Sequence, residues 1–318
     1  MPTNKPLVEA FDRRFLFFTG KGGAGKTLVS ATAATWSARQ GHRTLWVEMT
    51  EHPAGSRLFT DYQPDYEPKP LSDNLWGMNL KVQPAIEEYL ALVFPIPFLS
   101  RLIARNSLFQ AITAALPGID SLIPLGKLWY ELGRQQDGKP VWDRIVLDAP
   151  ATGHALAMLR LPGTVLGLVE TGNLAERTRE IDQVIGNTGL TRLFVVTTAE
   201  ELPIEETVAI VNEIDQQTNY RIDGVICNAL CPDIGQGKAE LFRQWLEDKP
   251  SAVSNHHAAD RDAAFRYHLS RLESRRRQQL QLLPRLERLQ VNLHDCPWMP
   301  GIADRQRLMR LSRVVEEQ

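Results

Sequence analysis

The sequence predicts an α/β protein built on a mostly parallel, doubly wound sheet that is flanked by helices. Two observations support this prediction. Short runs of Val, Ile, Leu and Phe recur along the 318 residues, and stretches with helical spacing lie between them. Repeated strand–helix–strand units place helices on both faces of a parallel sheet.

Five short apolar runs are predicted to be strands. Each is rich in Val, Ile, Leu or Phe, which is typical of strands that are buried on both faces. They are Phe15–Phe18, Thr44–Glu48, Arg144–Leu147, Arg192–Val196 and Gly224–Cys227, and a further strand is expected near Val291. Helices are expected at Thr27–Gln40 and Ile204–Gln217. Gly41 follows the first helix and Pro203 opens the second, and both positions suit helix ends.

The segment from Tyr89 to Leu132 interrupts this alternation, because it is rich in Leu, Ile, Phe and Pro. We expect a helical insertion over about residues 84–135, between the second strand and the Arg144 strand, within a single domain that spans residues 1–318. Four prolines are expected to divide it into short helices: Pro95, Pro97, Pro117 and Pro124. Core packing explains its apolar residues; alternatively, part of this surface docks a partner protein or an apolar cargo.

Composition excludes several classes of protein. The chain has 43% hydrophobic and 23% charged residues, which excludes disordered, collagen-like and coiled-coil proteins. A formal charge of −2 gives no global field that would gather nucleic acid. No apolar run is long enough to span a bilayer, and residues 1–12 lack the apolar core of a signal peptide. We therefore expect a cytoplasmic globular protein.

The C-terminal part is highly charged. Ala258–Gln290 is predicted to be a helix with a solvated face, and binding to acidic lipid or nucleic acid is the alternative. Leu308–Gln318 is only weakly amphipathic, which argues against a membrane-binding tail.

A glycine-rich turn follows the first predicted strand and opens the first predicted helix. It satisfies the pattern G-x4-G-K-[ST] of a phosphate-binding loop. Its backbone N–H groups and the helix N-terminus attract phosphate, the second lysine reaches the β- and γ-phosphates, and the threonine hydroxyl ligates Mg²⁺. The residues are Gly20, Lys21, Gly22, Gly23, Ala24, Gly25, Lys26 and Thr27. The sequence therefore predicts a P-loop NTPase that binds a nucleoside triphosphate.

A second lysine, Lys21, directly follows the first glycine of this loop. With it the loop resembles the deviant Walker A form found in a group of dimeric ATPases. In that group the early lysine crosses the dimer interface to the partner's nucleotide, so the resemblance implies a dimer and the same role for Lys21. A positive charge supplied in this way resembles an arginine finger.

The Arg144 strand ends in an acidic residue, followed by a turn. Asp148, at the carboxyl end of a strand beside the phosphate loop, is placed to hold Mg²⁺ through water. The stretch Asp-Ala-Pro-Ala-Thr-Gly-His resembles the switch II motif of ArsA-type anion-transporting and tail-anchored-protein-targeting ATPases, which Asp148, Thr152, Gly153 and His154 match. The resemblance implies that Gly153 senses the γ-phosphate. His154 either transmits that change or only satisfies a backbone carbonyl at a helix start.

More of the chain agrees, and the resemblance runs from about residue 14 to residue 312. Val195–Thr207 resembles a strand-to-helix segment that ends in E-T in this family. Asn228 matches the asparagine with which family members read the adenine edge. Pro297-Trp298-Met299-Pro300 falls where the family has its purine-ribose loop, so Pro297 and Met299 are expected to bind ATP.

The sequence departs from the family at switch I, where the family has an aspartate that activates the attacking water. Here Thr50 or His52 aligns with it, depending on the alignment, and neither is a carboxylate. We expect the adjacent Glu51 to supply the carboxylate; Glu48, or no residue, is the alternative.

Cysteine spacing also differs. Targeting factors of this family hold zinc with a C-x-x-C pair, whereas this chain has Cys227 and Cys231 in a C-x3-C spacing and a remote Cys296. We therefore expect no zinc site and no arsenite pumping. A single phosphate loop also excludes the tandem form of the arsenical pump.

Together these features predict an ATPase that uses ATP and Mg²⁺, with slow or partner-stimulated turnover. The expected catalytic residues are Lys21, Glu51 and Asp148, and the Mg²⁺ ligands are Thr27 and, through water, Asp148. The resemblance implies a homodimer or a paralogue heterodimer that handles a partner or cargo. We expect no nucleic-acid binding, and membrane contact only through a partner. The alternatives are an ATP-gated binding module with little hydrolysis and a MinD/ParA-like positioning ATPase.

Overall fold

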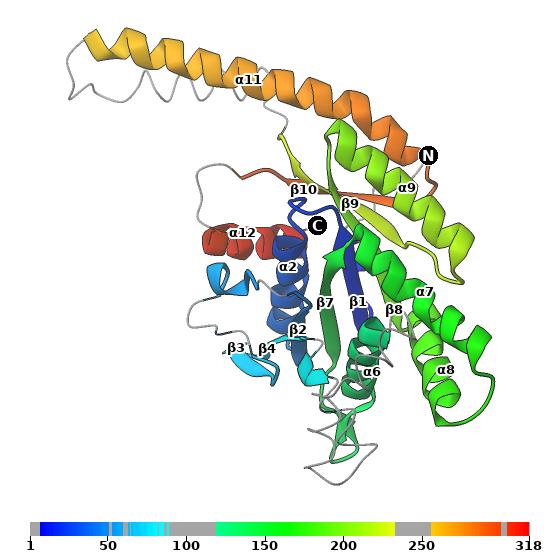
Figure 1. Ribbon diagram of the computed structural model, residues 1–318. Coiled ribbons are helices and arrows are strands. Elements are labelled where there is room, and N and C mark those ends of the chain that lie inside the picture. The colour runs from blue at the N-terminus through cyan, green and yellow to red at the C-terminus, as the bar shows by residue number, and fades with distance from the viewer. Residues whose placement is uncertain are drawn as a thin grey trace.

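An eight-stranded sheet lies at the centre of the described part of the chain (Figure 1). The computed structural model describes residues 7–50, 53–59, 63, 65–81, 83–85, 88, 119–232, 256–299 and 304–317. The strand order is β10-β9-β8-β1-β7-β2-β4-β3, and all neighbouring strands are parallel except β3 and β4. The predicted mostly parallel sheet is therefore confirmed.

All the predicted strands are present, and two more complete the sheet. The strands are β1 Phe15–Gly20, β2 Thr44–Glu48, β3 Lys69–Ser72, β4 Leu75–Asn79, β7 Arg144–Ala151, β8 Thr191–Thr198, β9 Gly224–Leu230 and β10 Asn292–Pro297, with a separate hairpin of β5 Gln135–Gln136 and β6 Lys139–Pro140. The sequence did not reveal β3 and β4. The first is mostly exposed and the second contains Trp76 and Gly77, so neither has the apolar run of a central strand.

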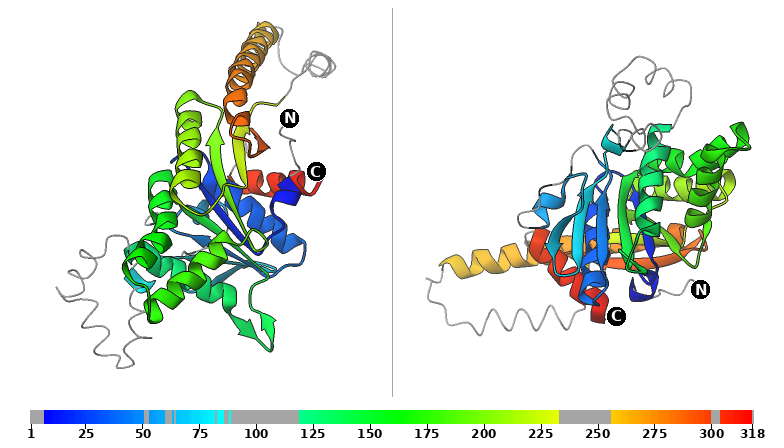
Figure 2. Two further views of the ribbon diagram at one scale, coloured as in Figure 1. Left: turned by 90° about the vertical axis from the view of Figure 1, so that its right-hand side faces the viewer. Right: turned by 90° about the horizontal axis from the view of Figure 1, so that it is seen from below.

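Helices cover both faces of the sheet (Figures 1 and 2). They are α1 Leu7–Ala10, α2 Lys26–Arg39, α6 Ile119–Gly133, α7 Thr152–Leu168, α8 Asn173–Gly186, α9 Glu201–Gln217, α11 His256–Glu287 and α12 Asp304–Glu317, with a 3₁₀ turn at Gly55–Arg57. Alternate residues of β1 enter two separate cores. Phe15 and Phe17 pack with residues of α6, α7, α8 and α9, while Leu16 and Phe18 pack with α2 and α12. The prediction of strands buried on both faces is confirmed.

The predicted helical insertion lies between β2 and β7 in the chain, and β3 and β4 precede it. Of its residues, 86–87 and 89–118 lie outside the described ranges, including Pro95, Pro97 and Pro117. The prediction that Pro124 separates two helices is wrong, because α6 continues through it. This proline lacks the N–H that would donate to the backbone of Asp120, so the helix loses one hydrogen bond at this position. Buried Leu125, Leu128 and Leu132 hold the rest of α6 on the sheet.

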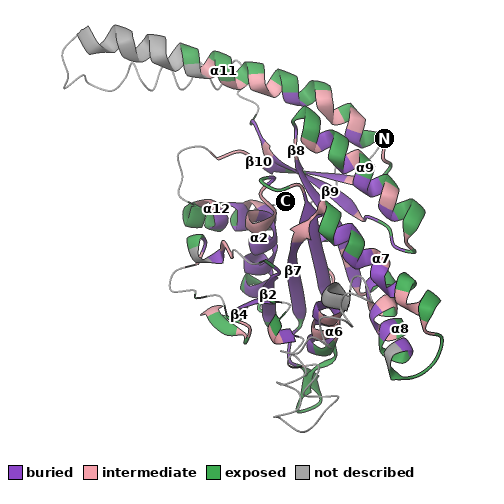
Figure 3. Ribbon diagram, viewed as in Figure 1, coloured by how far each residue is buried: buried purple, intermediate pink, exposed green. Residues whose placement is uncertain are grey.

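The helix α11 has 32 residues, and its N-terminal part extends beyond the sheet (Figures 1 and 2). Its C-terminal half packs on α9 and β9, where Gln279 and Leu286 are buried. Its outer side is exposed (Figure 3). The predicted helix with a solvated face is thus confirmed. Among the helices that the structure describes, none is long and apolar enough to cross a bilayer.

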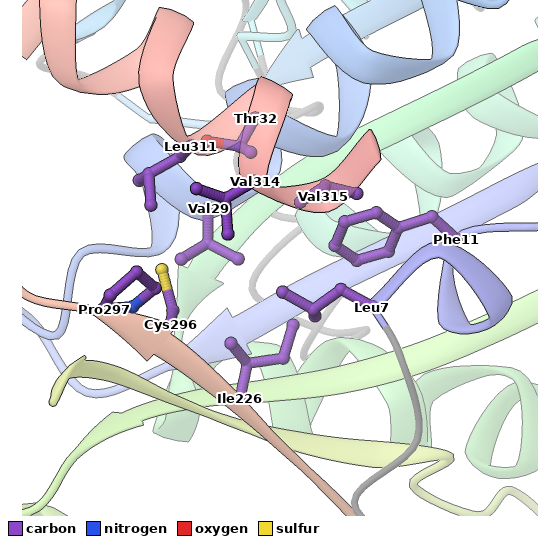
Figure 4. Close-up of a pocket in the computed structure, with 10 residues that line it drawn as sticks. All are labelled: Leu7, Phe11, Val29, Thr32, Ile226, Cys296, Pro297, Leu311, Val314 and Val315. Carbon is purple, nitrogen blue, oxygen red and sulfur yellow. The ribbon is translucent and has the colours of Figure 1, made fainter. Parts of the chain in front are cut away.

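The last helix, α12, packs on α2, and the description of its sequence as weakly amphipathic is wrong. Leu308, Leu311 and Val315 recur at helical spacing and are buried. Leu311 and Val315 also line a small, mostly apolar cavity together with Phe11 and residues of α2 (Figure 4). The only hydroxyl in this cavity wall, that of Thr32, donates to Leu28 O in its own helix. The cavity is a gap in core packing.

Replacing Leu311 by Ala should lower the free energy of unfolding by about 2–4 kcal/mol, because it removes a buried side chain between α12 and α2. Urea denaturation followed by far-UV circular dichroism measures the change. Met309→Ala is the matched control, since that side chain is 42% exposed on the same helix. Equal effects from the two substitutions would contradict this packing of α12.

Candidate nucleotide site

The predicted phosphate loop lies at the carboxyl end of β1 and leads directly into α2. At two positions of the loop glycine is required, because a Cβ atom would clash with a neighbouring residue and because φ is positive. A Cβ on Gly20 would lie 2.0 Å from Val196 O, and Gly20 has φ +147°. A Cβ on Gly25 would lie 2.2 Å from Asn228 Nδ2, and Gly25, the N-cap of α2, has φ +89°. Only glycine fits these positions, so the loop can curl around a phosphate with its N–H groups inward.

Thr27 and Asp148, the two expected magnesium ligands, are in direct contact. Thr27 Oγ1 donates to Asp148 Oδ2 over 2.6 Å. Asp148 is 6% exposed, and its other oxygen, Oδ1, is buried with no hydrogen-bond partner among the described residues. Register explains the placement, because Asp148 pairs with Phe18 of β1 just before the loop begins. The adjacent β7 thus brings its carboxylate to the first turn of α2.

Burial shifts the ionisation of both charged groups here. Desolvation raises the pKa of Asp148 from 3.8 to about 6, although the hydrogen bond from Thr27 and the charge of Lys26 lower it. Desolvation also lowers the pKa of Lys26, and the charge of Asp148 opposes this change. Burying the charges of Asp148 and Lys26 is costly, so their presence here indicates a site that binds a charged ligand. A hydroxyl and an unpartnered carboxylate oxygen are the hard donors that Mg²⁺ prefers, so the residues present fit this ion.

Lys21 forms an ion pair within its own chain. Its ammonium lies 2.5 Å from Glu206 Oε1, on the second turn of α9, and the two side chains are 32% and 44% exposed. Its backbone carbonyl accepts a hydrogen bond from Lys26 Nζ over 3.4 Å. The side chain of Lys21 is therefore directed to α9 in the single chain. Glu206 belongs to the segment ending in E-T, but its link to Lys21 was not evident from the sequence.

The switch II segment forms the end of β7 and the start of α7. The strand continues to Ala151, and Gly153 and His154 lie exposed in the first turn of the helix. The first N–H groups of a helix have no partner inside it, so Gly153 can offer one to a ligand. Thr19 Oγ1 donates to Pro150 O over 2.9 Å, which joins this segment to the strand that leads into the phosphate loop.

Of the two switch I carboxylates, Glu51 lies outside the described residues, whereas Glu48 is fully buried. Glu48 Oε1 accepts hydrogen bonds from the backbone N–H groups of Ala54 and Gly55, at 2.8 and 3.0 Å. Glu48 thus holds the loop that follows it, a role better suited to fixing switch I than to activating water.

The residues expected to bind the base lie together at the ends of β9 and β10. Asn228 Nδ2 donates to Ala24 O of the phosphate loop over 2.9 Å. Pro297 ends β10 opposite Leu230, whose carbonyl accepts from Trp298 N, and Pro297 and Met299 are half-buried. Sequence reasoning did not single out Trp298, although it stands between two residues that were named.

Similarity to known proteins agrees with this fold. A family model described as "Anion-transporting ATPase" matches residues 13–171 and 168–263. The chain belongs to the anion-transporting ATPase family. Its relatives include "ATPase BagA" of Mycobacterium tuberculosis, 27% identical over 230 residues that make up 69% of this chain and 66% of that protein. Another is "Putative arsenical pump-driving ATPase 2" of Aquifex aeolicus, 25% identical over 74% of this chain and 86% of that protein. The chain thus spans slightly less than two thirds of the mycobacterial relative.

In this family member all three cysteines are buried and unpaired. Cys227 and Cys296 belong to the two cores on opposite faces of the sheet. Burial raises the pKa of Cys296 to about 12 and raises that of Cys231 as well. Buried thiols of this kind are poor metal ligands, because the ligand is the thiolate. The expectation of no zinc site stays a prediction.

Replacing Asp148 by Asn should stabilise the nucleotide-free protein at neutral pH. The folded-state pKa is raised, so stability is fully present at low pH and is lost as pH rises from about 4 to about 6. The gain in free energy of unfolding should approach about 3 kcal/mol at pH 7.5 and be about half of that at pH 5. Urea denaturation at both pH values measures it, with exposed Asp73→Asn as the control. A loss of stability at pH 7.5 would show that the carboxylate is not strained by burial.

Proposed function

We propose that this family member is an Mg²⁺-dependent ATP hydrolase, with slow or partner-stimulated turnover. The observation that carries the proposal is the contact of Thr27 with Asp148 beside Lys26, in a loop where only glycine fits at two positions. A buried, partly unpartnered carboxylate beside a threonine, a lysine and a helix N-terminus suits a metal–triphosphate complex.

Each residue of the loop has a distinct task in this proposal. The N–H groups of Gly22, Gly23, Ala24 and Gly25 and the start of α2 hold the phosphates. Lys26 places its charge on the β- and γ-phosphates, and Gly153 reads the γ-phosphate through its N–H. Thr27 and, through water, Asp148 would hold Mg²⁺, and the bound ion would neutralise the charge that develops on the transferred phosphoryl group.

Lys21 is proposed to act on the nucleotide of a partner, in a homodimer or a paralogue heterodimer. In the single chain it is paired with Glu206, and both side chains are partly exposed. An exposed ion pair contributes at most about 1 kcal/mol. Closure of a dimer can therefore replace it with a stronger contact to phosphate, which carries more negative charge.

Glu51 is proposed to orient the attacking water, because the carboxylate of Glu48 already binds the backbone of Ala54 and Gly55. On the base side, an asparagine amide has two N–H hydrogens and an acceptor oxygen. Asn228 gives one hydrogen to Ala24 O. We propose that its remaining groups meet the edge of adenine, with Pro297 and Met299 beside the base and ribose.

A second candidate is an ATP-gated binding module with little hydrolysis. The absence of a carboxylate at Thr50 or His52, the positions that align with the switch I aspartate, favours it. A positioning ATPase that binds membrane through its C-terminus is disfavoured, because the apolar face of α12 is used on α2. A partner or apolar cargo at the insertion, the lack of nucleic-acid binding and a cytoplasmic location stay predictions.

Replacing Lys21 by Ala should lower ATP turnover by about 10³-fold, the scale of a missing arginine finger, because the charge that crosses the interface is lost. ATP affinity should change by less than about threefold, since Lys26 and the loop backbone remain. Phosphate release and binding of a fluorescent ATP analogue measure the two quantities. The control is exposed Lys139→Ala. Normal turnover of the Lys21 variant would refute the role across the interface, and no phosphate release by the unaltered protein, even with partners, would favour the binding module.

Replacing Glu206 by Gln should raise ATP turnover by about two- to fivefold at limiting protein concentration, because Lys21 no longer has to leave an ion pair before closure. Glu205→Gln is the matched control, since Glu205 lies next to Glu206 and pairs instead with Arg285. Turnover measured as a function of protein concentration separates dimer formation from chemistry. Unchanged or lower turnover of the Glu206 variant would contradict a restraining role for this pair.

A further inference from the structure

Gln279 is a buried polar residue on an otherwise exposed turn of α11. It is 3% exposed, whereas Arg277, Gln278 and Leu280 are all exposed. Both ends of its amide are used. Nε2 donates to Ala229 O over 3.1 Å, and Oε1 accepts from Cys231 N over 2.9 Å. A buried amide is stable only when it is satisfied in this way, so the side chain is fixed in one orientation.

The two hydrogen bonds lie on either side of Leu230, the last residue of β9. Ala229 has φ +57°, the left-handed conformation, which costs a residue with a Cβ about 1 kcal/mol or more. Arg276 Nη1 donates to Cys231 O over 2.5 Å and adds a third bond from the same helix. Side chains of α11 therefore hold the backbone of residues 229–231 in a conformation that it would not favour alone.

Asn228 directly precedes the strained residue. Its side chain is buried, donates to Ala24 O and lies against Gly25. Close packing against the phosphate loop therefore fixes the position of this side chain. A relaxation of Ala229 to negative φ would rotate the peptide that follows Asn228 and move its side chain. Two hydrogen bonds and one peptide bond thus join α11 to the phosphate loop: Gln279 bonds to Ala229, Ala229 follows Asn228 in the chain, and Asn228 bonds to Ala24.

We propose that Gln279 is a positioning residue that sets selection of the nucleobase. It holds the left-handed backbone of Ala229, near the end of β9, and thereby fixes the amide of Asn228 against the phosphate loop. This inference rests on the proposed function, in which Asn228 meets the edge of adenine. Adenine and guanine present opposite groups on that edge, an amino group and a carbonyl, so an asparagine amide discriminates between them only if its orientation is fixed.

Loss of Gln279 should affect only the part of the nucleotide affinity that comes from the base. Gln279 bonds to the backbone at residues 229 and 231 in the contacts that the structure gives it. Its link to the phosphate loop runs through Asn228 to Ala24 O, a carbonyl oxygen, and not through the N–H groups that are proposed to hold the phosphates. Loss of the fixed orientation of Asn228 should therefore lower the affinity for a nucleotide by as much as its base contributes to binding. The affinity for a triphosphate without a base should not change. If Gln279 only stabilised the fold, its loss would lower the affinities for ATP, GTP and inorganic tripolyphosphate equally, or would lower none of them.

The test uses the full-length protein with Gln279→Leu and, as matched control, Gln278→Leu on the exposed side of the same turn. The ligands are ATP, GTP and inorganic tripolyphosphate, each with Mg²⁺, measured by calorimetry together with KM and kcat for ATP. For the Gln279 variant we expect ATP affinity to fall about tenfold, the loss of roughly one hydrogen bond. Tripolyphosphate affinity and kcat should stay within about twofold, so that the preference for ATP over GTP falls. The Gln278 variant should retain the preference.

An unchanged ratio of ATP to GTP affinity in folded Gln279→Leu protein would overturn the inference. Should that variant fail to fold, Arg276→Ala removes the third bond to the same turn from a partly exposed position, and a smaller drop in the ratio is expected, whereas an unchanged ratio would again overturn the inference. The proposed function fails separately, when the unaltered protein binds neither ATP nor tripolyphosphate.

Discussion

The contact between Thr27 and Asp148 is the interaction on which the site depends. It places a carboxylate, almost without solvent, at the first turn of α2 and beside Lys26. In the absence of a ligand this burial is unfavourable, as the raised pKa of Asp148 shows. The hydrophobic packing on both faces of the sheet supplies the stability that keeps such a carboxylate in place.

Parallel strands explain why these groups meet. Phe18, Asp148, Glu48 and Asn79 occupy one row across β1, β7, β2 and β4, at the end where the strands turn into loops. Phe18 packs in the core, whereas the residues of this row in the neighbouring strands are polar. A change of one residue in register would turn Asp148 to the opposite face, away from α2. The register of the central strands is therefore part of the site.

Local patterns could be predicted from the sequence, and contacts between distant segments could not. The phosphate loop occupies eight consecutive residues, and β1 and β2 are short apolar runs, so spacing alone locates them. Glu206 pairs with Lys21 across 185 residues, and several neighbouring glutamates on α9 look the same in the sequence. Gln279 likewise has a glutamine beside it, and only burial distinguishes the two. Strand β4 was missed because Gly77 interrupts its apolar residues.

The shape of α11 has a mechanical consequence. Gln279, Arg276 and Leu286 hold the C-terminal half of the helix on β9 and α9, and about 23 residues extend from Gln279 to His256, the first described residue of the helix. At about 1.5 Å per residue this arm is roughly 35 Å long. A tilt of about 5° at the anchor moves the far end by about 3 Å. The helix is thus a lever that is held beside β9, and it magnifies small adjustments of the backbone at the end of that strand.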